Sequence, residues 1–351
     1  MSKPFPFAAI VGQEEMTLAL ILVAIDPLIG GVLIQGDRGT GKSTAIRALA
    51  NILPRLRSVK GCRYSCDPKD RNEMCLECKT QLDSIDEKRK KVLKAEYLNV
   101  PVVDLPLGVT EDRVVGSLDL QSALTEGIKK FEPGLLADAN RGFLYIDEVN
   151  LLEDHLVDLL IDVAASKVNI VEREGLSLTH PANFVLIGSG NPEEGDLRPQ
   201  LLDRFGFSIE VSTPTELNQR IEVIKRRNAF DTEPEKFISQ WTQKNIEITK
   251  KVESARRKLS KVVIPDEVLS VMAELCIYLK TDGLRGELTL SRASCALAAY
   301  ERSSKVKISH VKKLAKISLR HRLRRNPLDD TSSTARIERG IAEVFGDKPL
   351  D

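Results

Sequence analysis

The octapeptide Gly36–Ser43 has a spacing suited to binding phosphate, because its letters GDRGTGKS fit G-x-x-x-x-G-K-[ST] at every fixed position. It follows the apolar run Gly31–Gln35 and opens an expected helix at Ser43–Asn51, which is the setting that the motif requires. The glycines let backbone N–H groups turn inward around phosphate oxygens at a helix N-terminus, where the helix dipole favours anions. Lys42 would reach the outer phosphates of a nucleotide, and the Ser43 hydroxyl would ligate Mg²⁺. The alternative is a glycine-rich turn that only closes a strand, and the complete motif in this setting disfavours it.

Two adjacent acids, Asp147 and Glu148, follow the apolar run Phe143–Ile146. Carboxylates at the end of a buried strand are costly unless they meet a cation or polar partners. In a parallel sheet, that edge is also where ligands bind. We therefore expect Asp147 to hold the Mg²⁺ shell, and Glu148 to act as general base or to orient the attacking water. An exposed acidic turn is the alternative, which the phosphate loop makes less favourable.

A third apolar run, Asn183–Ile187, leads into a turn with Asn191 before Pro192. The amide of Asn191 is a candidate to hydrogen-bond the γ-phosphate or the attacking water. Taken alone the signal is weak, since Asn before Pro is also ordinary turn chemistry.

These groups need a scaffold that brings strand ends together, and the apolar runs supply it. Gly31–Gln35, Gly142–Ile146 and Asn183–Ile187 lack period-two alternation, as expected for parallel strands covered by helices on both faces. Helical patterns lie between them, so this part is predicted to be an α/β domain with a parallel sheet. Two segments interrupt it: the polar, cysteine-bearing insertion Ser58–Asn99, and Ser166–His180, whose alternation predicts a β-hairpin.

Beyond Pro214 the sequence loses its strand signals. Charged helical patterns cover Glu216–Asn228 and Glu235–Ser260, and apolar residues recur at helical spacing around Leu275 and over Leu288–Ala299. The predicted fold class is an α/β P-loop NTPase domain with a parallel sheet, followed by an all-helical C-terminal domain. The expected α/β domain, connecting helices and helical (lid) domain cover residues 1–215, 216–260 and 261–351.

Composition narrows the classes of partner. The 351 residues carry a formal net charge of +1 and 5% aromatic residues, which disfavours a dedicated nucleic-acid binder and base-stacking surfaces. The N-terminus lacks the apolar region of a secretory signal. The most apolar stretch, Met16–Gln35, is broken by Asp26-Pro27 and Gly30-Gly31, so we expect a helix, a turn and a strand and no membrane span. The expected location is the cytoplasm, or the plastid stroma in a eukaryote.

Four cysteines lie within the polar insertion in the pattern C-x3-C-x8-C-x2-C, at Cys62, Cys66, Cys75 and Cys78. Four thiols in a short segment of a reducing compartment favour tetrahedral Zn²⁺, which would staple a segment that lacks its own core. An iron–sulfur cluster or a redox-responsive thiol pair fits nearly as well, and a loop with unpaired thiols is the third interpretation. Cys276 and Cys295 lie on apolar helical faces and are expected to be buried small hydrophobes.

The basic run Lys305–Arg325 keeps apolar residues at helical spacing from Ile308 to Ile317. It predicts one packed helix with a solvated cationic face, and a docking surface for an acidic partner is the alternative. A short amphipathic piece is expected around Ile337–Phe345.

Five long segments stand in order along almost the whole chain: VGQEEMTLALILVAIDPLIGGVLIQGDRGTGKST, PVVDLPLGVTEDRVVGSLDL, FEPGLLADANRGFLYIDEVNLL, GNPEEGDLRPQLLDRFG and GLRGELTLSRA. Together they resemble the ATPase (I) subunit of magnesium chelatase, an AAA+ protein. The resemblance implies an ATP-hydrolysing motor that drives insertion of Mg²⁺ into protoporphyrin IX in chlorophyll or bacteriochlorophyll synthesis. It implies a homo-oligomeric ring, expected to be a hexamer, that works with an AAA+-like D-type subunit and a large porphyrin-binding H-type subunit. The ATPase subunit of an ATP-dependent cobalt chelatase and a MoxR-type AAA+ chaperone are the alternatives.

The resemblance also implies roles for matching positions. The phosphate-binding (Walker A) residues would be Gly36, Asp37, Arg38, Gly39, Thr40, Gly41, Lys42, Ser43 and Thr44. Asp147 would bind Mg²⁺ together with Ser43, and Glu148 and Asn191 would be catalytic. Arg204 matches the arginine finger, which acts on a neighbouring subunit's nucleotide, and Arg285 matches sensor 2; a guanidinium fork suits both roles. Leu105–Leu120 corresponds to an insertion that marks this AAA+ branch. The four clustered cysteines lie outside the family's nucleotide machinery.

Overall fold

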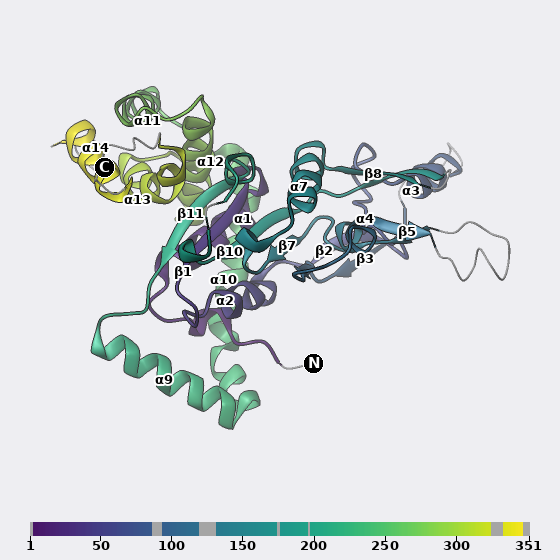
Figure 1. The fold of residues 1–351 in the computed structure, drawn as a ribbon, viewed down its shortest axis with the longest axis horizontal. Coiled ribbons are helices and arrows are strands. Elements are labelled where there is room, and N and C mark those ends of the chain that lie inside the picture. Colours follow the sequence, from purple (N-terminus) through teal and green to yellow (C-terminus); the bar gives the residue numbers. More distant parts are fainter. Residues whose placement is uncertain are drawn as a thin grey trace. The chain divides into compact units, whose positions relative to one another are not determined.

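The computed structural model describes residues 3–85, 93–118, 131–173, 176–195, 197–323 and 333–346. The chain forms two compact units (Figure 1). The first unit joins Met1–Ile52 to Gly190–Asp351, and the second unit is Leu53–Ser189. The phosphate loop lies in the first unit, and the paired acids and the four clustered cysteines lie in the second.

The first unit contains two parallel strands, β1 (Gly31–Gly36) and β11 (Phe205–Val211), with Val32 opposite Phe207. Strand β1 is buried from Gly31 to Ile34, which explains its unbroken apolar run. In β11 the apolar residues alternate with Gly206, Ser208 and Glu210, and of its residues only Glu210 is exposed. Helix α1 (Glu14–Ile25) is apolar on all sides because it contacts both strands and also α10 and α12.

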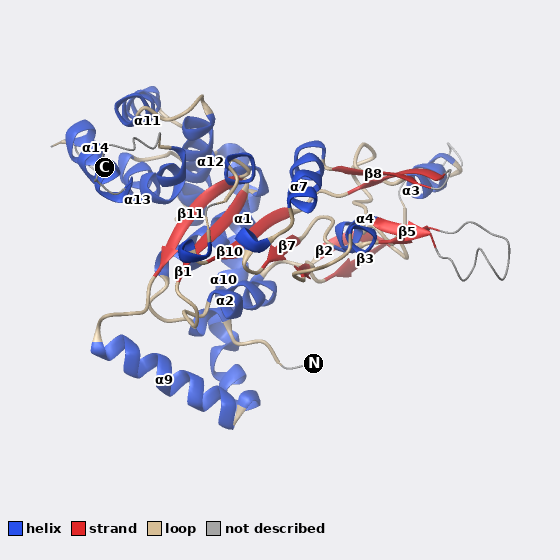
Figure 2. Cartoon of the chain, in the orientation of Figure 1, coloured by secondary structure: helices blue, strands red, loops and turns tan. Residues whose placement is uncertain are grey.

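The rest of the first unit is helical, as Figure 2 shows for the chain after β11. Its helices are α2 (Lys42–Leu49), α8 (Pro199–Leu202), α9 (Leu217–Thr232), α10 (Pro234–Lys258), α11 (Asp266–Leu279), α12 (Arg285–Tyr300), α13 (Ile308–Leu319) and α14 (Ser333–Phe345). Helices α11 to α14 contact one another, α12 also contacts α10, and α13 contacts β11. The amphipathic piece predicted around Ile337–Phe345 is the end of α14, where both named residues are buried.

The predicted helix over Lys305–Arg325 is only partly right. Helix α13 begins at Ile308 and ends at Leu319, and Arg320–Arg322 continue as a short 3-10 turn whose arginine side chains are buried. Arg324 and Arg325 lie outside the described residues. The side chains of Arg320 and Arg322 are 4% and 7% exposed, so they do not belong to a solvated cationic face. The sequence pattern could not show this, because their partners, Glu210 and Asp203, are distant in the chain.

The second unit contains three parallel strands, β4 (Val102–Leu105), β7 (Phe143–Ile146) and β10 (Val185–Gly190). Strand β7 lies between the other two, pairing with β4 on one side and β10 on the other. The two apolar runs predicted as parallel strands in this region are therefore confirmed. Parallel pairing carries both strand ends to one edge, so Asp147 after β7 lies near the end of β10.

The predicted hairpin is also present, as β8 (Val168–Arg173) paired antiparallel with β9 (Leu176–Pro181); its tip, Glu174-Gly175, lies outside the described residues. The remaining elements of this unit are β2 (Leu56–Val59), α3 (Leu76–Asp83), β3 (Ala95–Leu98), α4 (Glu111–Val115), β5 (Gly116–Leu118), β6 (Phe131–Pro133), α6 (Leu135–Asp138) and α7 (Asp154–Ser166). Strands β2 and β3 pair antiparallel and bracket the cysteine-bearing insertion. The family-specific insertion expected at Leu105–Leu120 covers α4 and β5, and its last two residues lie outside the described part. Over the described ranges, no helix combines the length and the hydropathy needed to span a bilayer.

Candidate nucleotide site

The phosphate loop connects β1 to α2, as its motif predicts. Gly36 ends the strand, and Gly41 caps the helix in a left-handed conformation with φ of 83°. A Cβ atom on Gly36 would collide with the carbonyl oxygen of Val211, whereas one on Gly39 or Gly41 would meet nothing within 4 Å. The loop is therefore tight against β11 on one side and open on the other, where backbone N–H groups at a helix start can face an anion.

Lys42 is buried although it carries a charge, with 7% of the residue exposed. Its Nζ donates hydrogen bonds to the carbonyl oxygens of Gly36 and, at 3.1 Å, of Asp37. These carbonyls hold the ammonium group over its own loop, which reduces the cost of burying it. An incoming phosphate would replace neutral carbonyls with a charged partner, so the arrangement suits phosphate binding.

A cavity of about 440 Å³ opens beside the loop, within the size range of small-molecule sites. Gly39, Thr40, Gly41 and Thr44 line its loop side. The opposite walls come from the N-terminal segment and from the turn and helix after β11, at Phe5, Ala9, Ile10, Val11, Gln13, Thr213, Pro214, Arg220, Val223, Ile224, Arg226 and Arg227. An apolar hollow that ends at a phosphate loop fits a nucleotide whose base enters the hollow and whose phosphates reach the loop.

Other residues near the loop have local partners within the first unit. Arg38 forms an ion pair with Glu194, and the hydroxyl of Thr40 donates to the carbonyl of Asp37 at 2.9 Å. Ser43 lies half-buried in the first turn of α2. The Oδ1 of Asn191 accepts a hydrogen bond from the Glu193 N–H at 3.2 Å and caps a 3-10 turn, which is the turn chemistry that its sequence context also allowed.

The paired acids lie at the end of β7, in the second unit. The hydroxyl of Ser189, at the end of β10, donates to Oδ1 of Asp147, and the Tyr145 hydroxyl lies 2.9 Å from the same serine oxygen. Ser189 is fully buried, so this contact orients the carboxylate of Asp147 from the protein interior. Glu148 takes the left-handed backbone conformation, with φ of 50°, and so turns the chain sharply after the strand. A carboxylate such as Asp147 and a hydroxyl such as Ser43 are hard oxygen donors, the ligand type that Mg²⁺ prefers.

The two predicted arginines both lie in the first unit, beside Asp203. Arg285, at the start of α12, forms an ion pair with the Asp203 carboxylate, and Arg322 contacts its other oxygen at 3.2 Å. Arg204 follows Asp203 at the turn between α8 and β11 and is half-buried. Its Nε has no hydrogen-bond partner within the described part of the chain. Asp203 thus connects Arg285 and Arg322, in the helical part of the first unit, to the turn that carries Arg204 (the arginine turn).

His321 and Arg322 fix this turn through the backbone. Both donate to the carbonyl oxygen of Phe205, each at 2.9 Å. Burial lowers the pKa of His321 to about 3, and the positive charge of Arg322 beside it acts in the same direction. The imidazole is therefore neutral at physiological pH and holds its proton on Nε2, toward the carbonyl.

Comparison with known proteins places the chain in a family. Residues 119–215 match the family described as magnesium chelatase, subunit ChlI, and residues 269–341 match the AAA lid domain. The chain is 58% identical to the magnesium-chelatase 38 kDa subunit of Acidiphilium rubrum, over 97% of each sequence. It is 56% identical to the subunit of the same name from Cereibacter sphaeroides, over 98% of this chain and 100% of the other. The chain belongs to the magnesium-chelatase ChlI family.

Solved structures agree with membership of the ChlI family. A structure of the complex between subunits BchI and BchD of magnesium chelatase, based on cryo-electron microscopy, contains a chain 52% identical to this one. The match has a TM-score of 0.51 and covers 93% of this chain and 98% of that one. A putative ATPase from Cytophaga hutchinsonii, 16% identical, shares the fold with a TM-score of 0.62 over 95% of this chain and 90% of that one. The predicted fold class, an AAA+ domain followed by a helical domain, is confirmed.

The sequence motifs of this ChlI-family chain do not include some residues that lie beside Asp147 or line the cavity at the phosphate loop. Ser189 and Tyr145 support Asp147 through hydrogen bonds, and Ile10 and Val11 line the cavity. A buried serine at a strand end and an apolar pair just before Gly12, which has φ of +69°, are the only local signals. Asp203 had no signal at all, because its role depends on arginines that are far away in the sequence.

Proposed function

We propose that this chain is the ATP-hydrolysing motor subunit of a magnesium chelatase, which inserts Mg²⁺ into protoporphyrin IX in chlorophyll or bacteriochlorophyll synthesis. The observation that carries the proposal is a complete phosphate loop, open beside a 440 Å³ cavity, in a chain 58% identical to a magnesium-chelatase 38 kDa subunit over nearly its full length. The metal that is inserted is a substrate of the whole enzyme, and the Mg²⁺ that accompanies ATP is a separate ion.

Each group of the site then has a distinct role in hydrolysis. The N–H groups of the phosphate loop bind the phosphate oxygens, and the Lys42 ammonium moves from its two carbonyl partners to the outer phosphates. Ser43 and Asp147 would hold the Mg²⁺ ion, which neutralises phosphate charge when it is bound. Glu148 orients the attacking water and accepts its proton, and Asn191 offers its amide to the γ-phosphate.

We infer that the working form is a ring, expected to be a hexamer, in which Arg204 completes the site of a neighbouring copy. Support comes from the half-buried guanidinium of Arg204, whose Nε has no partner within the described residues. Helix α9 has no buried residue and exposes Leu217 and Ile224 by 72% and 59%, so it offers apolar surface to a second copy. Arg285 belongs to the matched lid region and would sense the γ-phosphate, with Asp203 holding it beside the arginine turn.

The partners follow from the same proposal. The related BchI is solved in complex with BchD, which supports a D-type partner for this chain. A large porphyrin-binding H-type subunit would provide the tetrapyrrole site. We place the assembly where ATP is supplied, in the cytoplasm or the plastid stroma.

A reconstituted insertion assay tests the function. The chain is mixed with cognate D-type and H-type subunits, protoporphyrin IX and ATP, and metalloporphyrin is followed by fluorescence with Mg²⁺ or Co²⁺ as substrate. We expect ATP-dependent formation of Mg-protoporphyrin that requires all three subunits. Insertion of Co²⁺ in preference to Mg²⁺ would identify a cobalt chelatase. ATP hydrolysis with no insertion of either metal would contradict the chelatase assignment.

A further inference from the structure

The four cysteines of the insertion come together in the fold. Cys62 and Cys66 lie on the turn that follows β2, whereas Cys75 caps α3 and Cys78 lies in its first turn. Their Sγ atoms all lie within 4.8 Å of one another. Cys66, Cys75 and Cys78 are at most 4% exposed, and Cys62 is partly exposed. A loop with scattered, unpaired thiols would not converge in this way.

The spacing of the sulfur atoms distinguishes among the three interpretations of the sequence. The Sγ atoms of Cys62 and Cys75 are 3.9 Å apart. Zinc–sulfur bonds of about 2.3 Å at tetrahedral angles place neighbouring sulfurs about 3.8 Å apart, whereas a disulfide requires about 2.05 Å. In a four-iron cluster each thiolate binds a different iron, and in a two-iron cluster the four thiolates divide between two irons, so the four sulfurs spread farther than one tetrahedron allows. The observed set has the size of a site for a single ion.

The backbone around the thiols has the form of a ligand turn. The N–H of Cys75 donates to the Sγ of Cys66 at 3.1 Å, a hydrogen bond that stabilises sulfur as thiolate. The Cys62 N–H donates to the Val59 carbonyl at 3.1 Å, and the Val59 N–H donates to the Cys66 carbonyl at 2.9 Å. Backbone hydrogen bonds therefore fix both arms of the turn.

A thin apolar shell covers the cluster. Tyr64, Met74, Leu82 and Leu93 pack with the cysteines in one small core. So few side chains give limited stability alone, and segments of this size usually depend on a metal or on disulfides. The shell also keeps water from the thiolates, as it does in structural metal sites.

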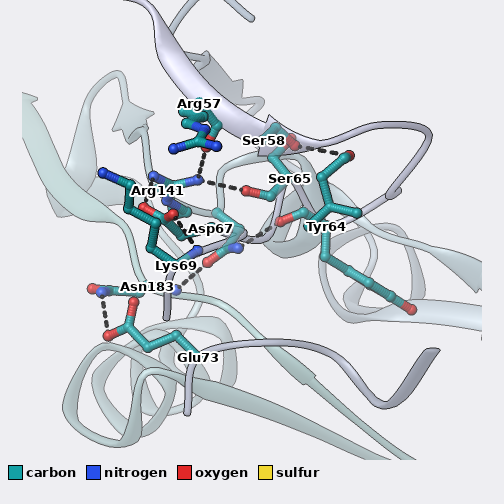
Figure 3. Close-up of polar contacts among 11 residues, drawn as sticks. Arg57, Ser58, Tyr64, Ser65, Asp67, Lys69, Glu73, Arg141 and Asn183 are labelled. Carbon is teal, nitrogen blue, oxygen red and sulfur yellow. Dashed lines mark hydrogen bonds and ion pairs between the residues drawn. The ribbon is translucent and has the colours of Figure 1, made fainter. Parts of the chain in front are cut away.

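Residues outside the insertion form hydrogen bonds to the turn that carries Cys62 and Cys66, as Figure 3 shows for Arg141. The guanidinium of Arg141 donates to the carbonyls of Arg57 and Ser65 at 2.8 and 2.9 Å, and pairs with Asp67 at 2.9 Å. The neighbouring Asn140 donates to the Tyr64 carbonyl at 2.6 Å. Arg141 keeps a left-handed backbone, with φ of 60°, in this position. These residues lie just before β7, so the cysteine turn is held against the start of the strand that Asp147 follows.

We propose that Cys62, Cys66, Cys75 and Cys78 bind one structural Zn²⁺ ion as four thiolates, and that this ion fixes the insertion to the start of strand β7. Each thiol releases its proton to solvent as the metal binds, and no electron is transferred. The proposal does not depend on the proposed chelatase function. Zinc is favoured over a single iron because four converging thiols in a segment with little core are the setting of structural zinc.

Metal analysis of the full-length chain tests this site. Protein without a metal-binding tag is purified in reducing buffer with neither added zinc nor chelator, and its metals are measured by mass spectrometry. We expect about one zinc per chain. Cys66→Ser and Cys78→Ser should lower bound zinc at least about 10-fold, whereas the matched control Cys295→Ser, outside the cluster, should retain it.

A second measurement covers the case in which the cysteine variants fail to fold. The wild-type chain is stripped of metal and titrated with Co²⁺ alone, which reports thiolate ligation by its near-ultraviolet charge-transfer band and a tetrahedral site by intense visible bands. Saturation at one Co²⁺ per chain, reversed by one Zn²⁺, would support the site. One iron per chain, an iron–sulfur spectrum, disulfides in the reduced preparation, or a metal-free chain with no cobalt thiolate band would each overturn it.

Discussion

The phosphate loop (Gly36–Ser43) and the cysteine segment (Cys62–Cys78) both connect a strand to a helix, but they differ in how open they are to solvent and to a ligand. Each follows a strand and leads into a helix, β1 to α2 and β2 to α3. The phosphate loop is open, with space beside Gly39 and Gly41 and an adjoining cavity. The cysteine segment is closed, because three of its four thiols are buried and all four face one another. An open loop suits a ligand that must enter, react and leave, and a closed one suits a permanent ion.

The two regions also differ in how much of the chain they need. The cysteine segment carries all four proposed ligands within a short stretch, and its anchors, Asn140 and Arg141, lie in the same unit. The proposed nucleotide site uses residues that are far apart in the sequence, from Lys42 to Asn191, and Arg204 from another copy. A variant of the nucleotide site should therefore lower ATP turnover and leave the bound zinc unchanged.

The largest difference between the effect on ATP turnover and the effect on bound zinc is expected for Lys42→Ala. Removing the ammonium that the loop carbonyls hold in place leaves the phosphates without their nearest cation, so ATP turnover should fall below detection. Bound zinc should stay at about one per chain. Steady-state phosphate release and metal analysis measure the two quantities on one preparation. Lys250→Ala, at an exposed position on α10, is the control, and near-normal turnover in Lys42→Ala would refute the phosphate-loop assignment.

Arg204→Ala tests whether the open site is completed by a neighbour. We expect ATP binding to persist while hydrolysis falls about 10³-fold, the effect of losing an arginine finger. Mixing this variant with Lys42→Ala should restore some activity, because mixed interfaces then combine an intact loop with an intact arginine. Arg257→Ala, exposed on α10, serves as the control. Wild-type turnover in Arg204→Ala, or no recovery on mixing, would count against a shared site.

Glu148→Gln should have the next largest effect, a ~100-fold loss of kcat with nucleotide binding retained, since the amide cannot accept the proton of the attacking water. Binding of a fluorescent ATP analogue and single-turnover hydrolysis separate the two steps. Glu153→Gln, at an exposed position before α7, should behave as wild type. Equal losses of binding and hydrolysis would mean that Glu148 supports the fold of the turn and has no role with water.

The two regions also differ in how far the sequence predicts them. The phosphate loop was placed correctly between strand and helix, because its motif constrains the backbone of consecutive residues. The parallel strands β7 and β10 were predictable from their unbroken apolar runs. For the cysteines the sequence left three interpretations open, since ligand spacing along a chain does not fix sulfur–sulfur distances in space.

Contacts between distant residues lay beyond prediction. Arg320 and Arg322 were predicted to lie on a solvated helix face, and the structure buries them against Glu210 and Asp203. Helical periodicity reports which side of a helix is apolar, but it cannot show that the helix stops at Leu319 and that the basic residues turn inward. For the same reason, the sequence could not show that the Ser189 hydroxyl donates to the distant Asp147.

That hydroxyl gives the smallest of the expected effects. Ser189→Ala removes the donor to Asp147 and leaves the carboxylate itself in place, so the Mg²⁺ concentration needed for half-maximal ATP hydrolysis should rise about 10-fold with little change in kcat. Tyr145→Phe should raise this Mg²⁺ concentration less, because the Tyr145 hydroxyl contacts Ser189, which in turn donates to Asp147. Ser294→Ala is the matched control, a fully buried serine on α12 whose hydroxyl has no partner among the described residues. If Ser189→Ala lowered kcat at saturating Mg²⁺ and left the Mg²⁺ requirement unchanged, Ser189 would act on the strand and not on the metal ligand. Bound zinc should be unchanged in all three variants, because the cysteine segment is held at the opposite end of β7.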